Sequence, residues 1–355
     1  MERKNIYMCM LAALLSCSDS VKVSRTLDEM PVIFPDYNGV VIPPNIAPLN
    51  FALNDQDAGS CAVFSFGGQQ FEVKGEKGGF VIPPSKWKKL LESAAGNSIQ
   101  VTVQVKQGNE WVAYSPFTIQ VAAEKIDSYL AYRLIDPGYE LWNKMGIYQR
   151  DLESYTQTPI IENKMSGNNC VNCHSFCMQS PDKMLFHMRE TFPGTILVDG
   201  DKIEKLNTKT KETISSLVYP SWHPSGKYVA FSVNTTKQAF HLNDKNRVEV
   251  YDEASDVVVY DVEKHEIVTA STIFSKDAFE TFPTFSPDGK TLYFCTAEAH
   301  PIPQEYSEVK YNLCSISFDP ATRTFGTQVD TLYNAKSGGM SASFPRVSPD
   351  GRYLL

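Results

Sequence analysis

The chain has 355 residues, 42% of them hydrophobic, which is enough for two or three packed domains. Its 33 basic and 41 acidic side chains give a formal net charge of −8, which argues against a protein that neutralises the phosphates of DNA or RNA. A single apolar stretch near the start excludes a multi-span membrane protein.

The first residues have the pattern of an export signal. A short charged start precedes an apolar run over residues 6–15, which is too short to cross a bilayer but typical of a secretory signal. The run ends in Leu-Leu-Ser-Cys, which resembles the bacterial lipobox. The resemblance implies a signal peptide over residues 1–16, a lipid on Cys17 and a tether over residues 17–30. The alternative is a plain secretory signal with an incidental cysteine, and both place the mature chain outside the cytoplasm.

Residues 31–125 have the alternation of a β-rich domain. Apolar and polar side chains alternate in four segments, which is the pattern of half-buried strands: 64–66, 71–73, 99–105 and 117–121. One helix is expected from Ser85, as N-cap, to Ala95, with Gly96 ending it. About six or seven short strands in this length predict a small immunoglobulin-like β-sandwich. Residues 126–168 are expected to connect it to the next domain.

A repeated turn motif determines the fold expected for the rest of the chain. Three copies of an aromatic-Pro-x-x-Ser/His-Pro-Asp/Ser-Gly-Lys/Arg pattern start at 219, 282 and 344, and a degenerate copy starts at Phe176 if one glycine is deleted. The spacings between the four starts fit four-stranded propeller blades, the later ones with insertions of about 20 residues. Asp182, Asp288 and Asp350 are turn residues of this pattern and not catalytic carboxylates.

These repeats resemble the WD40-like (PD40) repeats of TolB-like β-propeller proteins. The resemblance covers about half of the chain and implies a β-propeller over residues 169–355, with about four blade starts. The expected fold class is all-β: an immunoglobulin-like sandwich followed by a propeller. Because the sequence stops in the second strand of a blade and would leave open edges, we expect the natural protein to continue with more blades.

Residues 170–174 read Cys-x-x-Cys-His, the attachment signature of c-type haem. Two thiols at this spacing add to the two vinyl groups at one porphyrin edge, and the adjacent histidine faces the iron. The motif resembles that of the cytochromes c, which implies covalent haem c on Cys170 and Cys173 and a proximal iron ligand at His174. Cys177 follows, so a zinc site, part of an iron–sulfur cluster or a Cys170–Cys173 disulfide stay open.

A sixth iron ligand is expected from loops on one face of the propeller or from the connector. The motif is expected at the propeller entrance, just before the first strand, on the face that also carries the connections 188–194, 235–255 and 298–310. The candidates are Met165, Met188, His241, His300 and Met340. A methionine would raise the reduction potential relative to a second histidine, and five-coordinate iron is the alternative.

The leading functional hypothesis is a lipid-anchored propeller of the cell envelope that carries one covalent haem. It would transfer electrons or sense redox state on a protein-interaction platform, with a redox or envelope protein as its partner. The second hypothesis is a TolB-like protein- or glycan-binding propeller whose cysteines hold zinc or form a disulfide. The third is the propeller part of a larger hydrolase. No catalytic motif supports an enzyme, so an electron carrier or binding protein is favoured.

Overall fold

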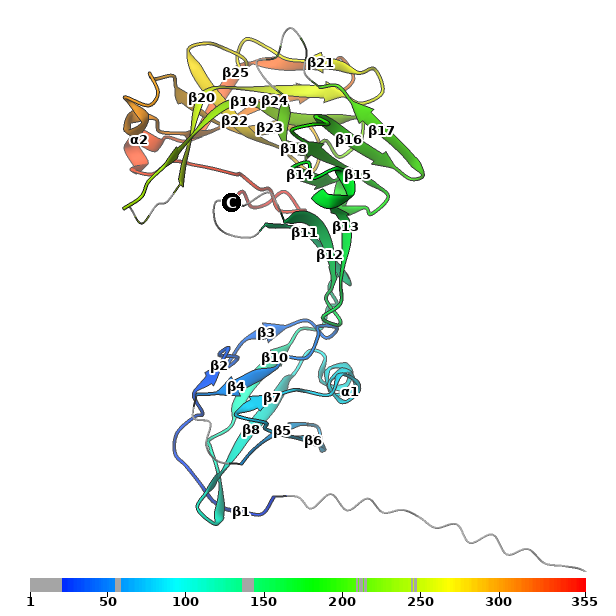
Figure 1. Cartoon of the computed structure of the whole chain (residues 1–355), viewed down its shortest axis with the longest axis vertical. Helices are drawn as coiled ribbons and strands as arrows, with labels where there is room; N and C mark the ends of the chain where they lie inside the picture. The colour runs from blue at the N-terminus through cyan, green and yellow to red at the C-terminus, as the bar shows by residue number, and fades with distance from the viewer. Residues whose placement is uncertain are drawn as a thin grey trace, which may run out of the picture. The chain divides into compact units, whose positions relative to one another are not determined.

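The computed structural model describes residues 21–355 except 55–58, 136–143, 209, 211–212, 214–215, 244 and 246–247. The signal peptide, Cys17 and the start of the tether lie outside the described residues. The chain divides into two compact units, Met1–Leu130 with Arg150–Gln157 and Ala131–Gln149 with Thr158–Leu355. Both units consist mainly of β-strands (Figure 1), as the sequence predicts. No described helix is long and apolar enough to cross a bilayer.

The N-terminal unit contains two sheets and one helix. The larger sheet has the order β1-β9-β8-β10-β3, with β5 pairing β8 and β6 pairing β5, and the smaller has the order β2-β4-β7. Their bounds are β1 Val23–Thr26, β2 Ile33–Phe34, β3 Val41–Ile42, β4 Phe51–Leu53, β5 Ser60–Phe66, β6 Gln69–Lys74, β7 Gly79–Phe80, β8 Ser98–Gln107, β9 Glu110–Ala113 and β10 Phe117–Val121. The four alternating segments of the sequence are all strands. The immunoglobulin-like type stays a prediction, since this unit also has two parallel strand pairs, β1–β9 and β10–β3.

Helix α1, Pro84–Ala94, contributes one face to the core of this unit. Trp87, Leu90, Leu91 and Ala94 are buried, and this spacing places them on one side of a helix. The predicted helix is therefore confirmed, but its predicted start is wrong. Pro83 is the N-cap, and no side chain caps the helix because the side chain of proline has no hydrogen-bond acceptor. Pro84 suits the first helical position, where a backbone amide has no partner within the helix.

The segment predicted as a connector forms a sheet of its own. Strands β11 (Tyr129–Ile135), β12 (Met145–Asp151) and β13 (Gln157–Glu162) pair in that order. Met145 and Ile147 are buried in a cluster with Val171 and Met184 of the following strands. This part of the connector is thus packed into the C-terminal unit.

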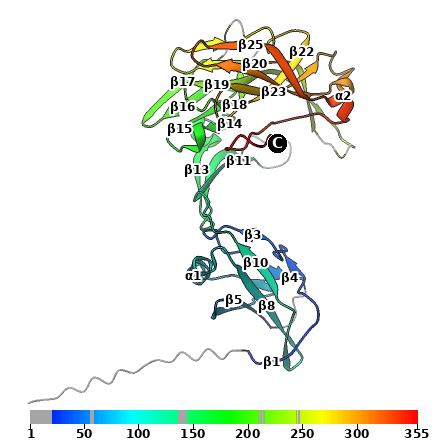
Figure 2. The ribbon, with the colours of Figure 1, turned by 180° about the vertical axis from the view of Figure 1, so that it is seen from behind.

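Three consecutive four-stranded sheets follow, and each is an antiparallel meander (Figure 2). Their bounds are β14 Val171–Phe176, β15 Lys183–Met188, β16 Gly194–Asp199 and β17 Lys202–Leu206; β18 Leu217–Trp222, β19 Tyr228–Phe240, β20 Val248–Asp261 and β21 Glu266–Val268; β22 Ala278–Phe285, β23 Thr291–Glu298, β24 Asn312–Asp319 and β25 Thr324–Tyr333. The first strands β14, β18 and β22 contact one another in turn, and apolar clusters fill the space between successive sheets. This is the arrangement of propeller blades and confirms the expected fold class.

The turn motif closes the hairpin between the first two strands of each blade. In the third blade the Ser286 hydroxyl donates to Asp288 Oδ1 at 2.6 Å, and the Lys290 amide donates to the same oxygen at 3.0 Å. These bonds lower the pKa of Asp288. Asp288 is therefore a turn residue, as predicted, because its carboxylate is used by the turn itself.

Gly289 lies in the turn of the third blade and contacts His223 in the turn of the second blade. Its φ is +72°, its carbonyl oxygen lies 3.1 Å from His223 Nε2, and a Cβ at this position would lie 2.2 Å from that nitrogen. We expect Gly289→Ala to lower the free energy of unfolding by about 2–4 kcal/mol. Two costs add: alanine is strained in a left-handed backbone, and its Cβ would overlap the His223 ring. Denaturant unfolding measures this.

Gly351 supplies the matched control. Its φ is +71°, but its nearest atoms to an added Cβ are those of Pro287 at 3.9 Å. Gly351→Ala should therefore lose only the backbone contribution, about 1 kcal/mol. Equal losses for the two variants would show that the contact with His223 is not what requires glycine.

Candidate functional site

The Cys-x-x-Cys-His motif lies on the first strand of the first blade. Cys170 immediately precedes β14, and the other motif residues belong to that strand. The expectation that the motif sits in a loop before the strand is therefore wrong. The strand extends further back than the repeat pattern indicated, because Val171 and Asn172 pair with β15.

A bulge in each first strand sets the true register of the repeats. The pairings Phe176↔Met184, Trp222↔Val229 and Phe285↔Leu292 make Phe176 equivalent to Trp222 and Phe285. The degenerate repeat therefore starts at Cys173 and not at Phe176. The sequence analysis aligned Phe176 with the first aromatic residue of the other repeats, Tyr219 and Phe282. That alignment is wrong, and the turn of the first blade is one residue longer than the turns of the next two.

In this register the last two residues of the Cys-x-x-Cys-His motif replace the aromatic-proline pair of the other blades. Cys173, Tyr219 and Phe282 each occupy the bulge with a left-handed backbone, at φ +50°, +51° and +53°. His174 then takes the position that proline holds in the next two blades. The first blade thus has the same bulge as its neighbours, with a thiol and an imidazole on it.

Cys170 and Cys173 are free thiols and both are partly exposed. Burial raises the pKa of Cys170, Arg189 opposes that increase, and the nearby Cys173 adds to it. The two sulfurs are therefore close enough to interact, as the motif requires, and neither is in a disulfide.

Cys177 belongs to a different environment. It is buried in the cluster between the first two blades, with Leu185 and Trp222, whereas Cys170 packs against the cluster of Val171 and Met184. The described residues contain no group of three or more Cys, His, Asp or Glu placed to hold a metal ion. Nothing in the described residues therefore supports binding of one metal ion by the motif residues together with Cys177.

His174 is half-buried, and this burial lowers its pKa, as does the neighbouring positive charge of Arg133. The backbone carbonyl of Ala131 accepts a hydrogen bond from the ring, which has the opposite effect. A neutral imidazole that donates through one nitrogen keeps a lone pair on the other. His174 is thus in the protonation state that a metal ligand needs.

Two arginines flank the motif, and sequence reasoning missed both. The Arg133 guanidinium donates to Asn172 Oδ1 at 2.5 Å, and the same oxygen accepts from the Cys173 amide at 2.9 Å. Arg189 follows β15, and its amide donates to the Cys170 carbonyl at 3.0 Å. Both side chains influence the pKa of Cys170. No local pattern marks them, because they come from two other strands.

An aromatic cluster adjoins the motif. The ring centroids of Tyr219, Phe282 and Phe344, which open the next three repeats, lie 4.0 to 5.7 Å apart. Cys173 contributes to raising the pKa of Tyr219, after the larger effect of burial. The first aromatic residues of three successive repeats therefore meet, and Cys173 lies near enough to Tyr219 to affect its pKa.

A pocket of about 270 Å³ opens beside the motif and is lined by Arg189, Tyr219 and His187, among others. His187 is buried, and burial with the charge of Arg189 lowers its pKa to about 4. Its Nδ1 lies 3.3 Å from the Thr195 hydroxyl. His187 is thus a neutral residue of the pocket wall near neutral pH.

Of the five candidate distal ligands, the structure places one in the same cluster as the motif. Met188 pairs with Val171 and is buried in the cluster that Cys170 contacts. Met165 and Met340 are 66% and 71% exposed, and the two histidines are paired with glutamates: His241 Nε2 lies 3.0 Å from Glu249, and His300 Nδ1 lies 3.0 Å from Glu305. The identity of the sixth ligand stays a prediction.

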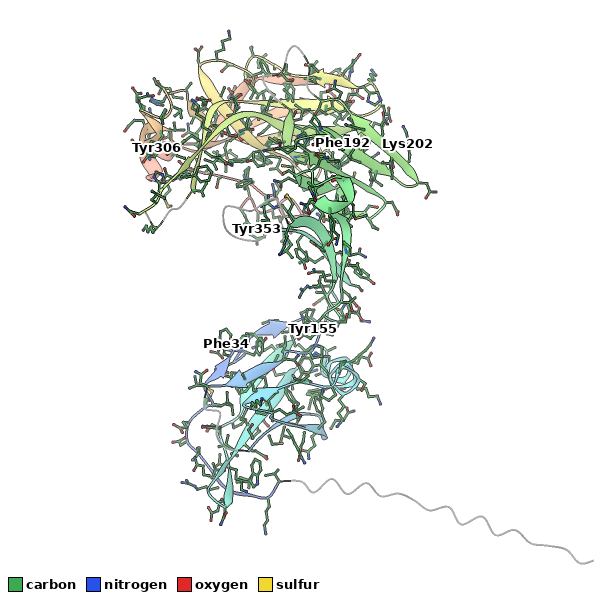
Figure 3. All side chains as sticks on the ribbon, in the orientation of Figure 1. Phe34, Tyr155, Phe192, Lys202, Tyr306 and Tyr353 are labelled. Carbon is green, nitrogen blue, oxygen red and sulfur yellow. The ribbon has the colours of Figure 1, made fainter. Side chains whose placement is uncertain are left out.

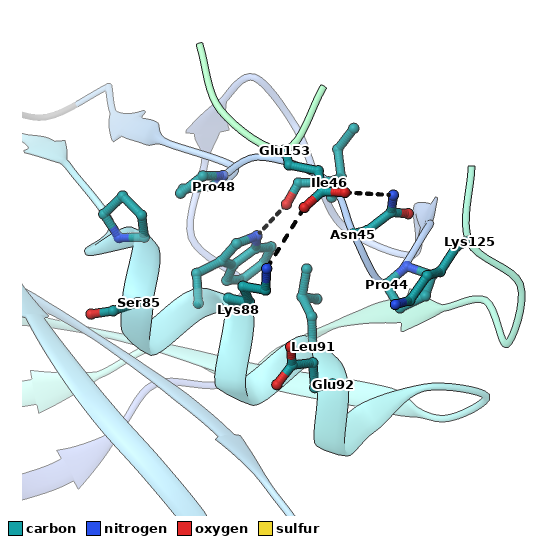
Figure 4. A pocket seen from close by; sticks show the side chains of 12 residues that line it. Pro44, Asn45, Ile46, Pro48, Ser85, Lys88, Leu91, Glu92, Lys125 and Glu153 are labelled. Atoms are coloured by element: carbon teal, nitrogen blue, oxygen red, sulfur yellow. Dashed lines mark hydrogen bonds and ion pairs between the residues drawn. The ribbon is translucent and has the colours of Figure 1, made fainter. Parts of the chain in front are cut away.

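A further pocket, of about 310 Å³, belongs to the N-terminal unit (Figure 4). Trp87 Nε1 donates to the Ile46 carbonyl at 3.1 Å, and Lys88 Nζ lies 3.7 Å from Glu153 Oε2. Its lining has no cysteine or histidine. This pocket therefore has none of the chemistry of the motif.

No family model and no curated protein matches the chain. Among solved structures it is similar to an oligogalacturonate lyase in complex with manganese, with 12% identity, 72% of this chain and 69% of that chain covered, and a TM-score of 0.36. An oligogalacturonate lyase from Vibrio parahaemolyticus has 10% identity, 92% and 86% coverage and a TM-score of 0.36. A puromycin-hydrolyzing peptidase from Mycobacterium tuberculosis has 13% identity, 68% and 38% coverage and a TM-score of 0.33. The assignment of blades rests on the strand pairing of this chain.

Proposed function

We propose that this protein is a lipid-anchored β-propeller of the cell envelope that carries one covalent haem c and transfers electrons or senses redox state. The observation that carries the proposal is the replacement of an aromatic-proline pair by Cys173 and His174 on an otherwise regular blade. Packing in the other blades uses an apolar pair at this place, so the change calls for a role beyond packing. The export pattern ending at Cys17 supports an envelope location.

The side chains around the motif fit a haem. Cys170 and Cys173 would form the two thioethers, and His174 would be the axial ligand. Arg133 and Arg189 would pair with the propionates, since guanidinium and carboxylate form strong charge-assisted hydrogen bonds. The bound group would supply one-electron redox chemistry, while the protein determines ligation, solvent access and docking.

The Ala131 carbonyl gives His174 the support that metal-bound histidines usually have. A hydrogen bond to one ring nitrogen would favour one tautomer and leave the lone pair of the other nitrogen available to bind iron. Ala131 belongs to β11, in the sheet whose apolar side chains pack with those of the first blade. This contact would orient His174 toward a ligand.

The deciding experiment is an absorption spectrum of the protein made in a host that matures c-type haem, followed by a haem stain on a denaturing gel. We expect a Soret band and a stained band that survives denaturation. No Soret band in folded protein would overturn the proposal. Zinc analysis and thiol counting would then separate a metal site from a disulfide, and the binding-platform hypothesis would lead.

His174→Ala should keep covalent attachment but change the iron's coordination. The cysteines still form the thioethers, whereas the axial ligand is lost, so the Soret and α-bands should shift and the reduction potential should change. Spectra of the oxidised and reduced forms measure this. His265→Ala is the matched control, because His265 hydrogen-bonds Tyr260 at 3.0 Å in the second blade. Unchanged spectra for His174→Ala would remove the ligand role.

A further inference from the structure

A second cavity in the C-terminal unit, of about 430 Å³, has a lining unlike that of the haem motif. One wall is the segment Glu249–Asp252 of β20, which belongs to the long hairpin that extends the second blade. The other wall is the connection after β23, with Tyr306 and Tyr311. Tyr306, labelled in Figure 3, lies in this connection between β23 and β24. The insertions of two blades thus form this cavity together.

Aromatic rings make up much of the cavity wall. Tyr251 and Tyr306 come from different blades, and their ring centroids are 5.2 Å apart at 55°. Tyr311 and Phe282 also line the cavity. Tyr306 is 49% exposed, so its ring is accessible from solvent.

Two carboxylates face the same cavity, and its lining contains no lysine or arginine. Glu249 Oε2 accepts from the Tyr251 hydroxyl at 2.5 Å and lies 3.0 Å from His241 Nε2. Asp252 Oδ2 accepts from the Tyr311 hydroxyl at 3.4 Å. Among the described residues Asp252 forms no ion pair within 4.0 Å, and burial raises its pKa. Its side-chain hydrogen bonds come from the neutral groups of Asn234 and Tyr311, so no cation among the described residues neutralises this carboxylate.

We propose that this cavity binds a small organic ammonium ion, such as a quaternary or methylated amine. Aromatic faces attract a cation through their quadrupole, and the attraction is strongest where water is partly excluded. Asp252 adds a full negative charge beside the rings. An anionic ligand would meet two carboxylates and no lysine or arginine in the lining, so the charge of the lining selects against it.

The test compares choline with its neutral isostere, 3,3-dimethylbutan-1-ol, by titration calorimetry on the full chain. Choline should bind saturably, and at least tenfold more tightly than the isostere, with affinity falling as salt is added. Equal binding of the two would overturn the proposal, because the site would then recognise shape and not charge. Binding of methyl glucoside without binding of choline would overturn it in favour of a saccharide site.

Two single substitutions test whether choline binds in this cavity. Tyr306→Leu should weaken choline binding at least tenfold by removing an aromatic face, and Asp252→Asn should do the same by removing the charge. Tyr129→Leu is the matched control, because Tyr129 is 60% exposed and does not line the cavity. Circular dichroism checks folding. Unchanged affinity in folded Tyr306→Leu and Asp252→Asn would place choline elsewhere and overturn the proposal.

Discussion

Replacing Cys170 and Cys173 together with alanine should abolish covalent haem attachment. In the proposed haem site each thiol would supply one thioether bond, so the double variant would have no covalent link and each single variant one at most. Haem staining after denaturation and the mass of the intact protein measure the result. We expect no stained band for the double variant and a weaker band for each single one.

Cys177→Ala is the matched control, because it makes the same change four residues beyond Cys173. Cys177 is 7% exposed and packs in the cluster between the first two blades. Its loss should cost about 1 kcal/mol of stability through packing and leave the haem in place. Attachment that survives the double variant, or depends on Cys177, would contradict the assignment of the thiols.

Glu280→Gln should stabilise the protein above neutral pH. Glu280 on β22 and Asp256 on β20 are 3% and 5% exposed, and Ser275 donates to both, at 3.3 and 3.1 Å. The other carboxylate oxygen of Glu280 has no hydrogen-bond partner among the described residues. Burial raises the pKa of Glu280 to about 7, with Asp256 adding to the effect, and raises that of Asp256 to about 6.

The direction of the pH dependence follows from these pKa values. Between about pH 4 and pH 7 the folded protein keeps protons that the unfolded chain has released, so this pair makes stability fall as pH rises. Glutamine cannot ionise and removes that penalty. The variant's gain over the parent should be near zero at pH 4 and on the order of 3 kcal/mol at pH 8.

Denaturant unfolding at several pH values measures this gain. Glu263→Gln is the control, because its side chain is 66% exposed and only 3.8 Å from Lys227 at the surface. Its stability should differ from the parent by less than about 0.5 kcal/mol at any pH. A Glu280→Gln gain that is the same at pH 4 and pH 8 would show that ionisation of the pair is not the cause.

Local patterns in the sequence were enough for the all-β class of the fold and for several of its strands. Alternation located β8 and β10, and helical spacing located α1, because each depends on which side chains face a core. The Pro-Asp-Gly turns located the blades, because their backbone conformation depends on residues within the turn. The start of α1 was wrong, because its cap is a proline and not a serine.

The Cys-x-x-Cys-His motif is visible in five consecutive residues, and its role in haem attachment stays a prediction. The residues that surround the motif in the fold could not be predicted from the sequence. The spacing of Cys170, Cys173 and His174 is a local property. The register that places Cys173 and His174 on the aromatic-proline positions depends on which residues of β15 pair with β14. The sequence analysis started this repeat at Phe176 and therefore did not find that register.

The partners of the site were decided by tertiary structure alone. Arg133 and the Ala131 carbonyl come from β11 and Arg189 from beyond β15, while the aromatic cluster comes from three later repeats. The buried pair of Asp256 and Glu280 and the cavity between Tyr251 and Tyr306 likewise join strands or insertions that are distant in sequence. Periodicity reports which face of a strand is buried but not which residue of another strand lies against it, so side-chain chemistry could be predicted from the sequence and its environment could not.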